Sequence, residues 1–223
     1  MMNPEFAGLT IAVAPAVNQC GSTAFDPDHF ADEMANELGY VDGVNVVPVS
    51  RVKDVMRQRG WTQVDRVGQA RDLAAALEAD AVLVFAVTAY DPYKPPKIGL
   101  TAQLLGERAE ALPRVNPVTL SRQPAATEAQ GAQGTGWVLA QASRVFDASH
   151  TDCLEDVKEF ARHRDAGNNP YGYRVYVVSQ RRFMQYCCNA TLRLLFDGKE
   201  GITAHARASE RSPVPEERRR ASR

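Results

Sequence analysis

Cysteine has the widest chemical reach of any residue type in this sequence, because a thiolate can bind metal, attack a carbonyl or form a disulfide. The four cysteines are Cys20, Cys153, Cys187 and Cys188. They form no CxxC pair, whereas zinc sites usually use two closely spaced ligand pairs. Cysteines that are neighbours in sequence, such as Cys187 and Cys188, rarely form a disulfide with each other, because the small ring that it closes is strained. We therefore expect buried apolar cysteines; a disulfide from Cys20 or Cys153 to the adjacent pair stays open if the protein is exported.

Motifs for catalysis or nucleotide binding do not occur. A phosphate-binding loop would lie in Pro15–Ser22, which holds one glycine and neither GxxxxGK[ST] nor GxGxxG spacing. No GxSxG or SxxK motif supplies a nucleophile, and the four histidines are scattered. We expect a protein that is not an enzyme, with no catalytic residue, no cofactor and no metal. An enzyme whose carboxylates meet only in the folded chain is the alternative that stays open.

The charge balance indicates what kind of partner the protein takes. The 223 residues carry 26 basic and 27 acidic side chains, a formal net charge of −1, so no overall field attracts nucleic acid. The local basic clusters are Arg181-Arg182 and Arg218–Arg220, without aromatic residues on which bases could stack. We expect no nucleic-acid partner. No apolar run reaches the length of a transmembrane helix, and Met1–Phe6 lacks the basic start of a signal peptide, which taken literally predicts a cytoplasmic protein.

One short segment has the composition of a protein-contact surface. Tyr90-Asp91-Pro92-Tyr93 places two aromatic residues and a proline at the end of a predicted strand, where we expect them to be exposed. These four residues are our protein-contact candidates. A turn stiffened by proline, with no partner, is the other interpretation.

The elements that must position these residues follow a regular alternation in the first hundred residues. Apolar runs at 9–14, 44–49 and 81–87 predict strands, and the last of these, apolar on both faces, predicts a central strand. Apolar residues at helical spacing predict helices over 27–39, 50–60 and 67–79. Asp26 followed by Pro27 is a typical start for the first of them.

A hairpin and two helices are predicted after the turn. Apolar and polar residues alternate over Ile98–Leu105, which predicts a strand with one solvent-exposed face. A strand over 136–147 is its expected partner. Between them, 108–135 has no hydrophobic period and predicts a long loop. A helix begins at Thr151 or Asp152, and a second carries a broad apolar face over Phe183–Leu195 that should pack on the sheet.

These elements predict an α/β fold with a mixed sheet of about five strands flanked by helices, a C-terminal helical extension and a disordered tail. We expect an α/β domain over 1–147, the helical extension over 148–200 and the tail over 201–223, where little can be buried.

Several of these segments resemble a known group of proteins. Ile11–Pro15, Val46–Val52 and above all Leu73–Tyr90 are similar to the α/β domain shared by the curli-secretion lipoprotein, the lipoprotein activators of penicillin-binding proteins and the amino-terminal domain of TolB. The resemblance covers about residues 9–147. It implies a bacterial envelope protein, in the periplasm or at the outer membrane, that binds other envelope proteins or assembles with itself. Members usually carry a lipidated cysteine after a signal peptide, and Val17–Cys20 does not match that signal.

Our leading hypothesis is therefore a non-enzymatic, protein-binding or assembly module of the cell envelope, lipid-anchored only if an export signal precedes this sequence. The alternative is a cytosolic regulatory or ligand-binding α/β domain. Its small ligand would lie at the carboxyl ends of the strands, near Pro15, Val49 and Thr88.

Overall fold

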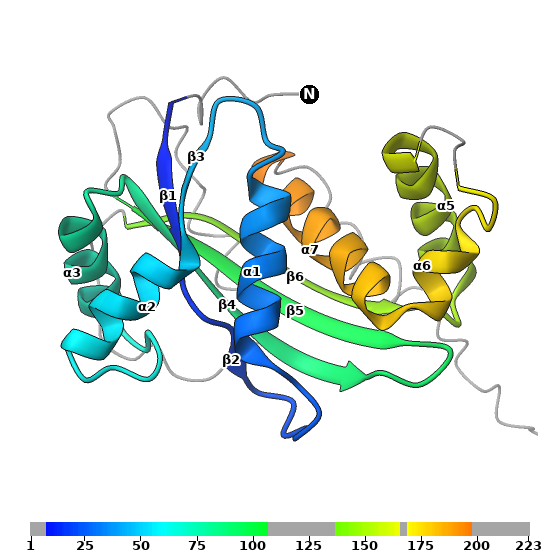
Figure 1. Ribbon diagram of the computed structural model, residues 1–223, viewed down its shortest axis with the longest axis horizontal. Helices are drawn as coiled ribbons and strands as arrows, with labels where there is room; N and C mark the ends of the chain where they lie inside the picture. Colours follow the sequence, from blue (N-terminus) through cyan, green and yellow to red (C-terminus); the bar gives the residue numbers. More distant parts are fainter. Residues whose placement is uncertain (1–7, 107–136, 166–168, 198–223) are drawn as a thin grey trace, which may run out of the picture.

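The protein has one mixed β-sheet with helices on both faces (Figure 1). The computed structural model describes residues 8–106, 137–165 and 169–197. The strands run in the order β3-β1-β4-β5-β6, and a short strand, β2, also pairs with β4. The predicted α/β class with a mixed sheet is thus confirmed, with one two-residue strand added that the sequence pattern did not indicate. The predicted loop at 108–135 and tail at 201–223 lie outside the described residues.

The parallel half of the sheet follows the predicted alternation. β1 (Thr10–Val13) lies between β3 (Asn45–Val47) and β4 (Ala81–Asp91) and is parallel to both. Helix α1 (Pro27–Leu38) packs on one face, and α2 (Val49–Gln58) with α3 (Val67–Leu77) packs on the other.

The start of α1 is the one that the sequence predicted. Asp26 caps the helix: its Oδ1 accepts from the backbone N–H of Asp28 (3.0 Å) and of His29 (3.3 Å), and Pro27 occupies the first turn. This cap sets the point at which the chain, after β1, β2 and the loop that follows them, turns back along the sheet.

The antiparallel half is the predicted hairpin. β5 (Lys97–Gly106) pairs with β4 on one side and with β6 (Val138–Asp147) on the other. β6 is an edge of the sheet. The strands β4, β5 and β6 are longer than the parallel strands and extend past the ends of α2 and α3 (Figure 1).

The main core lies between the sheet and the C-terminal helices. Helix α7 (Gln180–Asp197) contacts β5, β6 and α1, so its broad apolar face packs on the sheet as predicted. Helices α5 (Thr151–Asp165) and α6 (Arg174–Val178) extend this layer. Cys153, Cys187 and Cys188 are buried in this core and Cys20 is half-buried; none of them forms a disulfide.

The second core is smaller and covers only part of the opposite face. Helices α2 and α3 pack over β1 and the first half of β4. Farther along, the same face of the antiparallel strands carries exposed or half-exposed side chains that no described helix covers: Thr88, Lys97, Thr101, Gln103, Gln141, Ser143 and Val145.

Candidate protein-contact surface

The loop after β1 is held firmly beside the end of β4. Strand β2 (Val17–Asn18) pairs with Ala86 and Val87, and the N–H of Gln19 donates to the carbonyl of Val87 at 2.9 Å. Asn18 organises the turn that follows. Its Oδ1 accepts from the Cys20 thiol and from the N–H of Gly21, both at 3.2 Å, and its amide nitrogen donates to the carbonyl of Ser22 at 3.0 Å. The loop therefore presents a defined surface.

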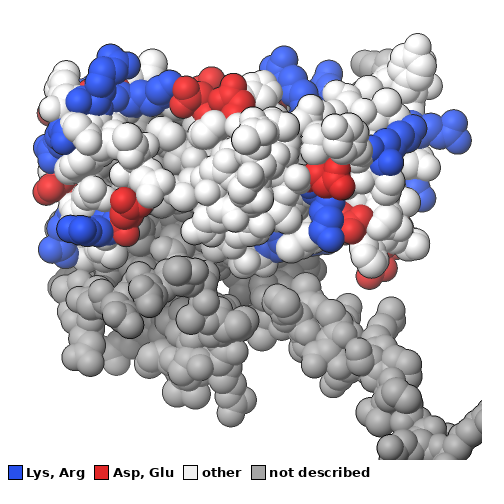
Figure 2. All heavy atoms as spheres, turned by 90° about the horizontal axis from the view of Figure 1, so that it is seen from below, with Lys and Arg blue, Asp and Glu red and all other residues white. Residues whose placement is uncertain are grey.

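This surface has no charge. No charged residue occurs between Leu9 and Phe25. Figure 2 views the molecule from the side on which this loop lies, and a broad uncharged centre separates charged residues at either side. The exposed members of the loop are Asn18, Gln19, Gly21, Thr23 and Ala24.

Tyr90 is half-buried at this end and packs against the core. The register of β4 against β5 shifts between Val87 and Ala89, and this bulge turns Tyr90 toward the core face of the sheet. Its ring packs edge-on against Phe25 and Phe30, with centroids 5.9 and 5.8 Å away, and burial raises the pKa of its hydroxyl. The hydroxyl also accepts a hydrogen bond from the amide of Gln180. Tyr90 is therefore less exposed than expected, because part of its ring packs on the core.

Tyr93 is the exposed aromatic residue of the predicted segment. It is 81% exposed, and its N–H donates to Asp91 Oδ1 at 3.0 Å, which fixes the turn. Pro92, the residue before it, is half-buried. We call the exposed loop residues Asn18–Ala24 together with Tyr93 the uncharged end; Asp91 and Lys94 form its charged rim. The role of Tyr90, Asp91, Pro92 and Tyr93 in binding a partner stays a prediction.

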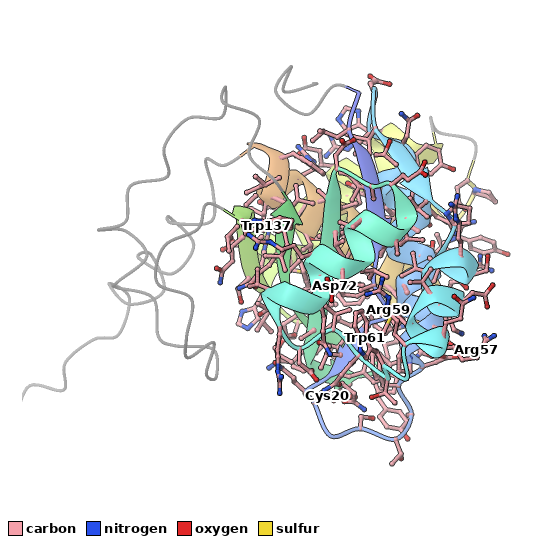
Figure 3. All side chains as sticks on the ribbon, turned by 90° about the vertical axis from the view of Figure 1, so that its left-hand side faces the viewer. Cys20, Arg57, Arg59, Trp61, Asp72 and Trp137 are labelled. Carbon is pink, nitrogen blue, oxygen red and sulfur yellow. The ribbon has the colours of Figure 1, made fainter. Side chains whose placement is uncertain are left out.

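A hollow of about 450 Å³ opens next to the uncharged end, at the carboxyl end of β1. Its floor is apolar, from Ala16 and Met56, and a salt bridge of 2.5 Å between Lys53 and Asp28 crosses its rim. Figure 3 shows Trp61 and Arg57 on this side, and Arg59 lies over the Trp61 ring at 5.1 Å. Its remaining lining residues are Pro15, Asn18, Pro27, Arg57, Trp61, Thr62 and Gln63.

The ligand position expected at the strand ends corresponds to this hollow only in part. Of the three expected residues, Pro15 lines it, whereas Val49 is buried at the start of α2 and Thr88, in β4, is not among the lining residues. Helix α1 leaves β1 toward one face and α2 leaves β3 toward the other, so the hollow forms where the two connections diverge.

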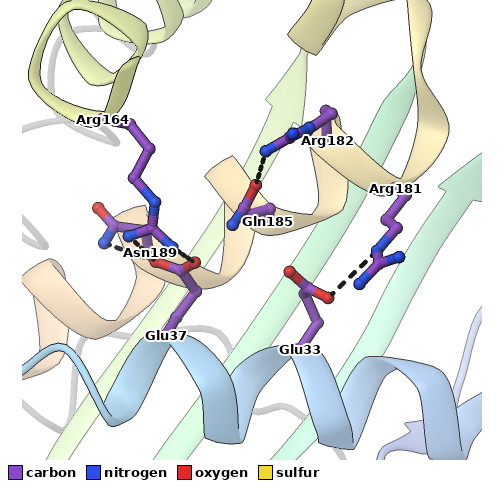
Figure 4. A network of polar contacts seen from close by, with 7 residues as sticks. All are labelled: Glu33, Glu37, Arg164, Arg181, Arg182, Gln185 and Asn189. Carbon is purple, nitrogen blue, oxygen red and sulfur yellow. Dashed lines mark hydrogen bonds and ion pairs between the residues drawn. The ribbon is translucent and has the colours of Figure 1, made fainter. Parts of the chain in front are cut away.

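Two buried carboxylates hold the helical layer together, and the sequence pattern does not indicate them. Glu37 of α1 is 1% exposed and accepts from Arg164 (2.7 and 3.4 Å) and from the amide of Asn189 (3.0 Å) (Figure 4). One turn earlier, Glu33 pairs with Arg181 at 3.8 Å. Burial raises the pKa of Glu37, and the Arg164 guanidinium opposes that rise. These contacts join α1 to α5 and α7.

Among residues 8–106, 137–165 and 169–197, no cluster of three metal-ligating side chains occurs. Within the same described ranges, no helix is long and apolar enough to cross a membrane.

Comparison with known proteins gives structural likenesses alone. No protein-family description matches the sequence, and no curated protein matches it. Among solved structures, the chain is similar to lipoprotein GNA1162 from Neisseria meningitidis (19% identity over 71% of this chain and 97% of that one, TM-score 0.45). It is also similar to the LpoB C-terminal domain from Salmonella enterica (14%, 65% and 86%, TM-score 0.43) and to the PelC dodecamer from Paraburkholderia phytofirmans (14%, 85% and 88%, TM-score 0.38).

A lipoprotein is thus among the proteins that this chain is similar to, and the expected resemblance to envelope lipoproteins is confirmed in this part. At TM-scores below 0.5, none of these likenesses assigns an activity or a partner to this chain. The resemblance to the curli-secretion lipoprotein and to TolB stays a prediction.

Proposed function

We propose that this protein is a non-enzymatic binding module of the bacterial cell envelope that docks another envelope protein through its uncharged end. The observation that carries the proposal is the ordered, charge-free loop Asn18–Ala24 at the same end of the sheet as the exposed ring of Tyr93. Burying uncharged groups against a partner costs less free energy than burying charges, and tyrosine is enriched in protein interfaces. The charged residues Asp91 and Lys94 at the boundary match the polar rim of such an interface.

The chemistry of this surface supports binding over catalysis. Its side chains offer amide and hydroxyl hydrogen bonds and one aromatic face, which suit recognition. The envelope assignment is supported by the sequence resemblance over residues 9–147. Fractionation of source cells tests it, because a protein found only in the cytosol would overturn the envelope assignment.

Replacing Tyr93 by Ala tests the docking surface directly. We expect Tyr93→Ala to weaken capture of the envelope partner by about 1–4 kcal/mol while leaving the melting temperature unchanged, because the ring makes no core contact. Capture is measured by cross-linking in envelope extracts, followed by quantitative pull-down.

Tyr171→Ala is the matched control. Tyr171 is also a strongly exposed tyrosine, at 73%, in the turn before α6. Equal capture by the Tyr93→Ala and Tyr171→Ala variants would reject the uncharged end as the docking surface.

A ligand-binding domain is the second candidate function, and the hollow beside α2 favours it. Apolar floor residues with Lys53, Asp28 and Arg57 at the rim suit a small amphipathic ligand. A thermal-shift screen against nucleotides and acidic metabolites separates the two candidates, because only this one requires a discrete ligand that raises the melting temperature.

A further inference from the structure

The two edges of the sheet differ in a way that points to a second interaction surface. The β3 edge is three residues long and is followed by Pro48, so little backbone is open there. The β6 edge is ten residues long. It contains neither lysine nor proline, the residues with which monomeric proteins usually protect a long edge strand. β6 is therefore a long edge whose basic side chain, Arg144, is held by Asp156, and no described strand pairs with its outer side.

The hydrogen bonds of the hairpin show which backbone groups of β6 are open. The N–H of Ala148 donates to the carbonyl of Pro96 at 3.0 Å, so every second residue from Ala148 backwards directs its backbone toward β5. The residues between them, Gln141, Ser143 and Val145, direct their N–H and C=O groups outward. In the part of the chain that the structure describes, no group pairs with these outward groups. Their side chains are exposed, Val145 by 54%.

We propose that β6 pairs antiparallel with β6 of a second copy of this chain, across a two-fold axis at Ser143. In this register, Val145 lies opposite Gln141 of the second copy and Arg144 lies opposite Ala142, so no like charges meet. Moving the axis to Arg144 would place two arginines face to face. The edge can therefore pair with itself about a two-fold axis without like-charge contacts, which is the property that a symmetric pair requires.

The surroundings of β6 suit this pairing. On one face, Arg144 forms a salt bridge of 2.5 Å with Asp156 of α5, and pairing with a second β6 strand leaves this salt bridge in place. On the other face, Thr101 and Ser143 share a hydrogen bond of 2.8 Å on a part of the sheet that α2 and α3 do not cover. Two copies would share one continuous sheet, and each would shield the exposed Val145 side chain of the other.

A charge placed on the edge tests the proposal with the full chain. We expect the unmodified protein to form dimers as its concentration rises, and Val145→Lys to raise the dissociation constant about tenfold or more. Gln103→Lys is the control, because Gln103 lies on the same open face but in β5, one strand in from the edge. Sedimentation equilibrium measures the association, and thermal melts confirm that both variants fold.

A cysteine on the predicted axis tests the register. Facing residues of a hydrogen-bonded antiparallel pair have Cα atoms about 5.5 Å apart, which a disulfide can span. Under mild oxidation we expect Ser143→Cys to form covalent dimers much faster than either the unmodified chain or Thr101→Cys, whose residue lies inside the sheet. A chain that stays monomeric at every concentration, a dimer indifferent to Val145→Lys, or equal cross-linking of Ser143→Cys and Thr101→Cys overturns the proposal. None of these outcomes bears on the Tyr93 surface.

Discussion

Gly99 explains why Tyr90 points into the core. Gly99 lies opposite the bulge in β4, and a Cβ atom added to it would meet Thr88 Oγ1 at 2.5 Å and the Ala89 nitrogen at 3.0 Å. Strict alternation along β4 would place Tyr90 on the same face as Val82, which packs under α2 and α3. The extra residue of the bulge moves the Tyr90 side chain to the opposite face, where it contacts Phe30. The sequence pattern predicted the strand but not the bulge, because the residue that accompanies the bulge, Gly99, belongs to the neighbouring strand.

Replacing Gly99 by Ala tests this role. We expect Gly99→Ala to lower the free energy of unfolding by about 1–3 kcal/mol, because backbone atoms as well as the Thr88 side chain must move. The control is Gly68→Ala in α3, where an added Cβ meets nothing within 4 Å and the helix gains about 0.5–1 kcal/mol. Urea denaturation of both variants measures the difference. Equal stability of the two would mean that the bulge accommodates a side chain.

At the scale of the elements, the sequence predicted best where local chemistry decides the structure. Helix α1 begins at the predicted cap, Asp26, and buries Phe30, Met34 and Leu38 as their spacing indicates. The same spacing did not indicate that Glu37 is buried too. Its partner Arg164 lies 127 residues away, and no local pattern reveals which distant helix will cover the second side of α1.

The ion pair between Glu37 and Arg164 allows a prediction about how stability depends on pH. At neutral pH, we expect Arg164→Leu to cost about 3–5 kcal/mol of stability, because the charged Glu37 loses its cation in buried surroundings. Burial already raises the pKa of Glu37, and loss of Arg164 raises it further. A carboxyl whose pKa is higher in the folded state contributes stability below its unfolded pKa and loses that contribution as the pH rises through the folded pKa. The deficit of the variant should therefore shrink as the pH falls to about 4.

Comparison with Arg162→Leu isolates the effect. Arg162 is exposed on the same helix, so its replacement should cost little at any pH. Arg164 also stacks over Tyr40 at 3.9 Å, and the loss of that contact leaves a part of the deficit that does not change with pH. The free energy of unfolding is measured from neutral to acidic pH for each protein. A deficit of the same size throughout would show that Glu37 is not held ionised by Arg164.

For the whole molecule, alternating strand and helix signals were enough to predict the sheet, the hairpin and the burial of α7 on it, because each depends on apolar periodicity. The uncharged end was predictable only in part. The composition of the segment around Tyr93 indicated a contact surface. Asn18–Ala24 has no distinctive pattern, and its position beside β4 follows from the pairing of β2 with that strand. The hollow likewise forms between segments that are adjacent only in the fold, α2 and the carboxyl end of β1.

The cysteines provide a test of how cooperatively the main core unfolds. Burial raises the pKa of the thiols of Cys153, Cys187 and Cys188, and only a thiolate reacts quickly with a disulfide reagent. Cys20, half-buried in the loop, is the accessible one. We expect one fast-reacting thiol in the folded protein and three that react only as fast as the chain unfolds globally. Cys20→Ser should remove the fast phase and Cys188→Ser should leave it intact, as followed by absorbance with an aromatic disulfide reagent. Fast reaction of Cys153 alone among the three would mean instead that α5 opens independently of α7 and the sheet.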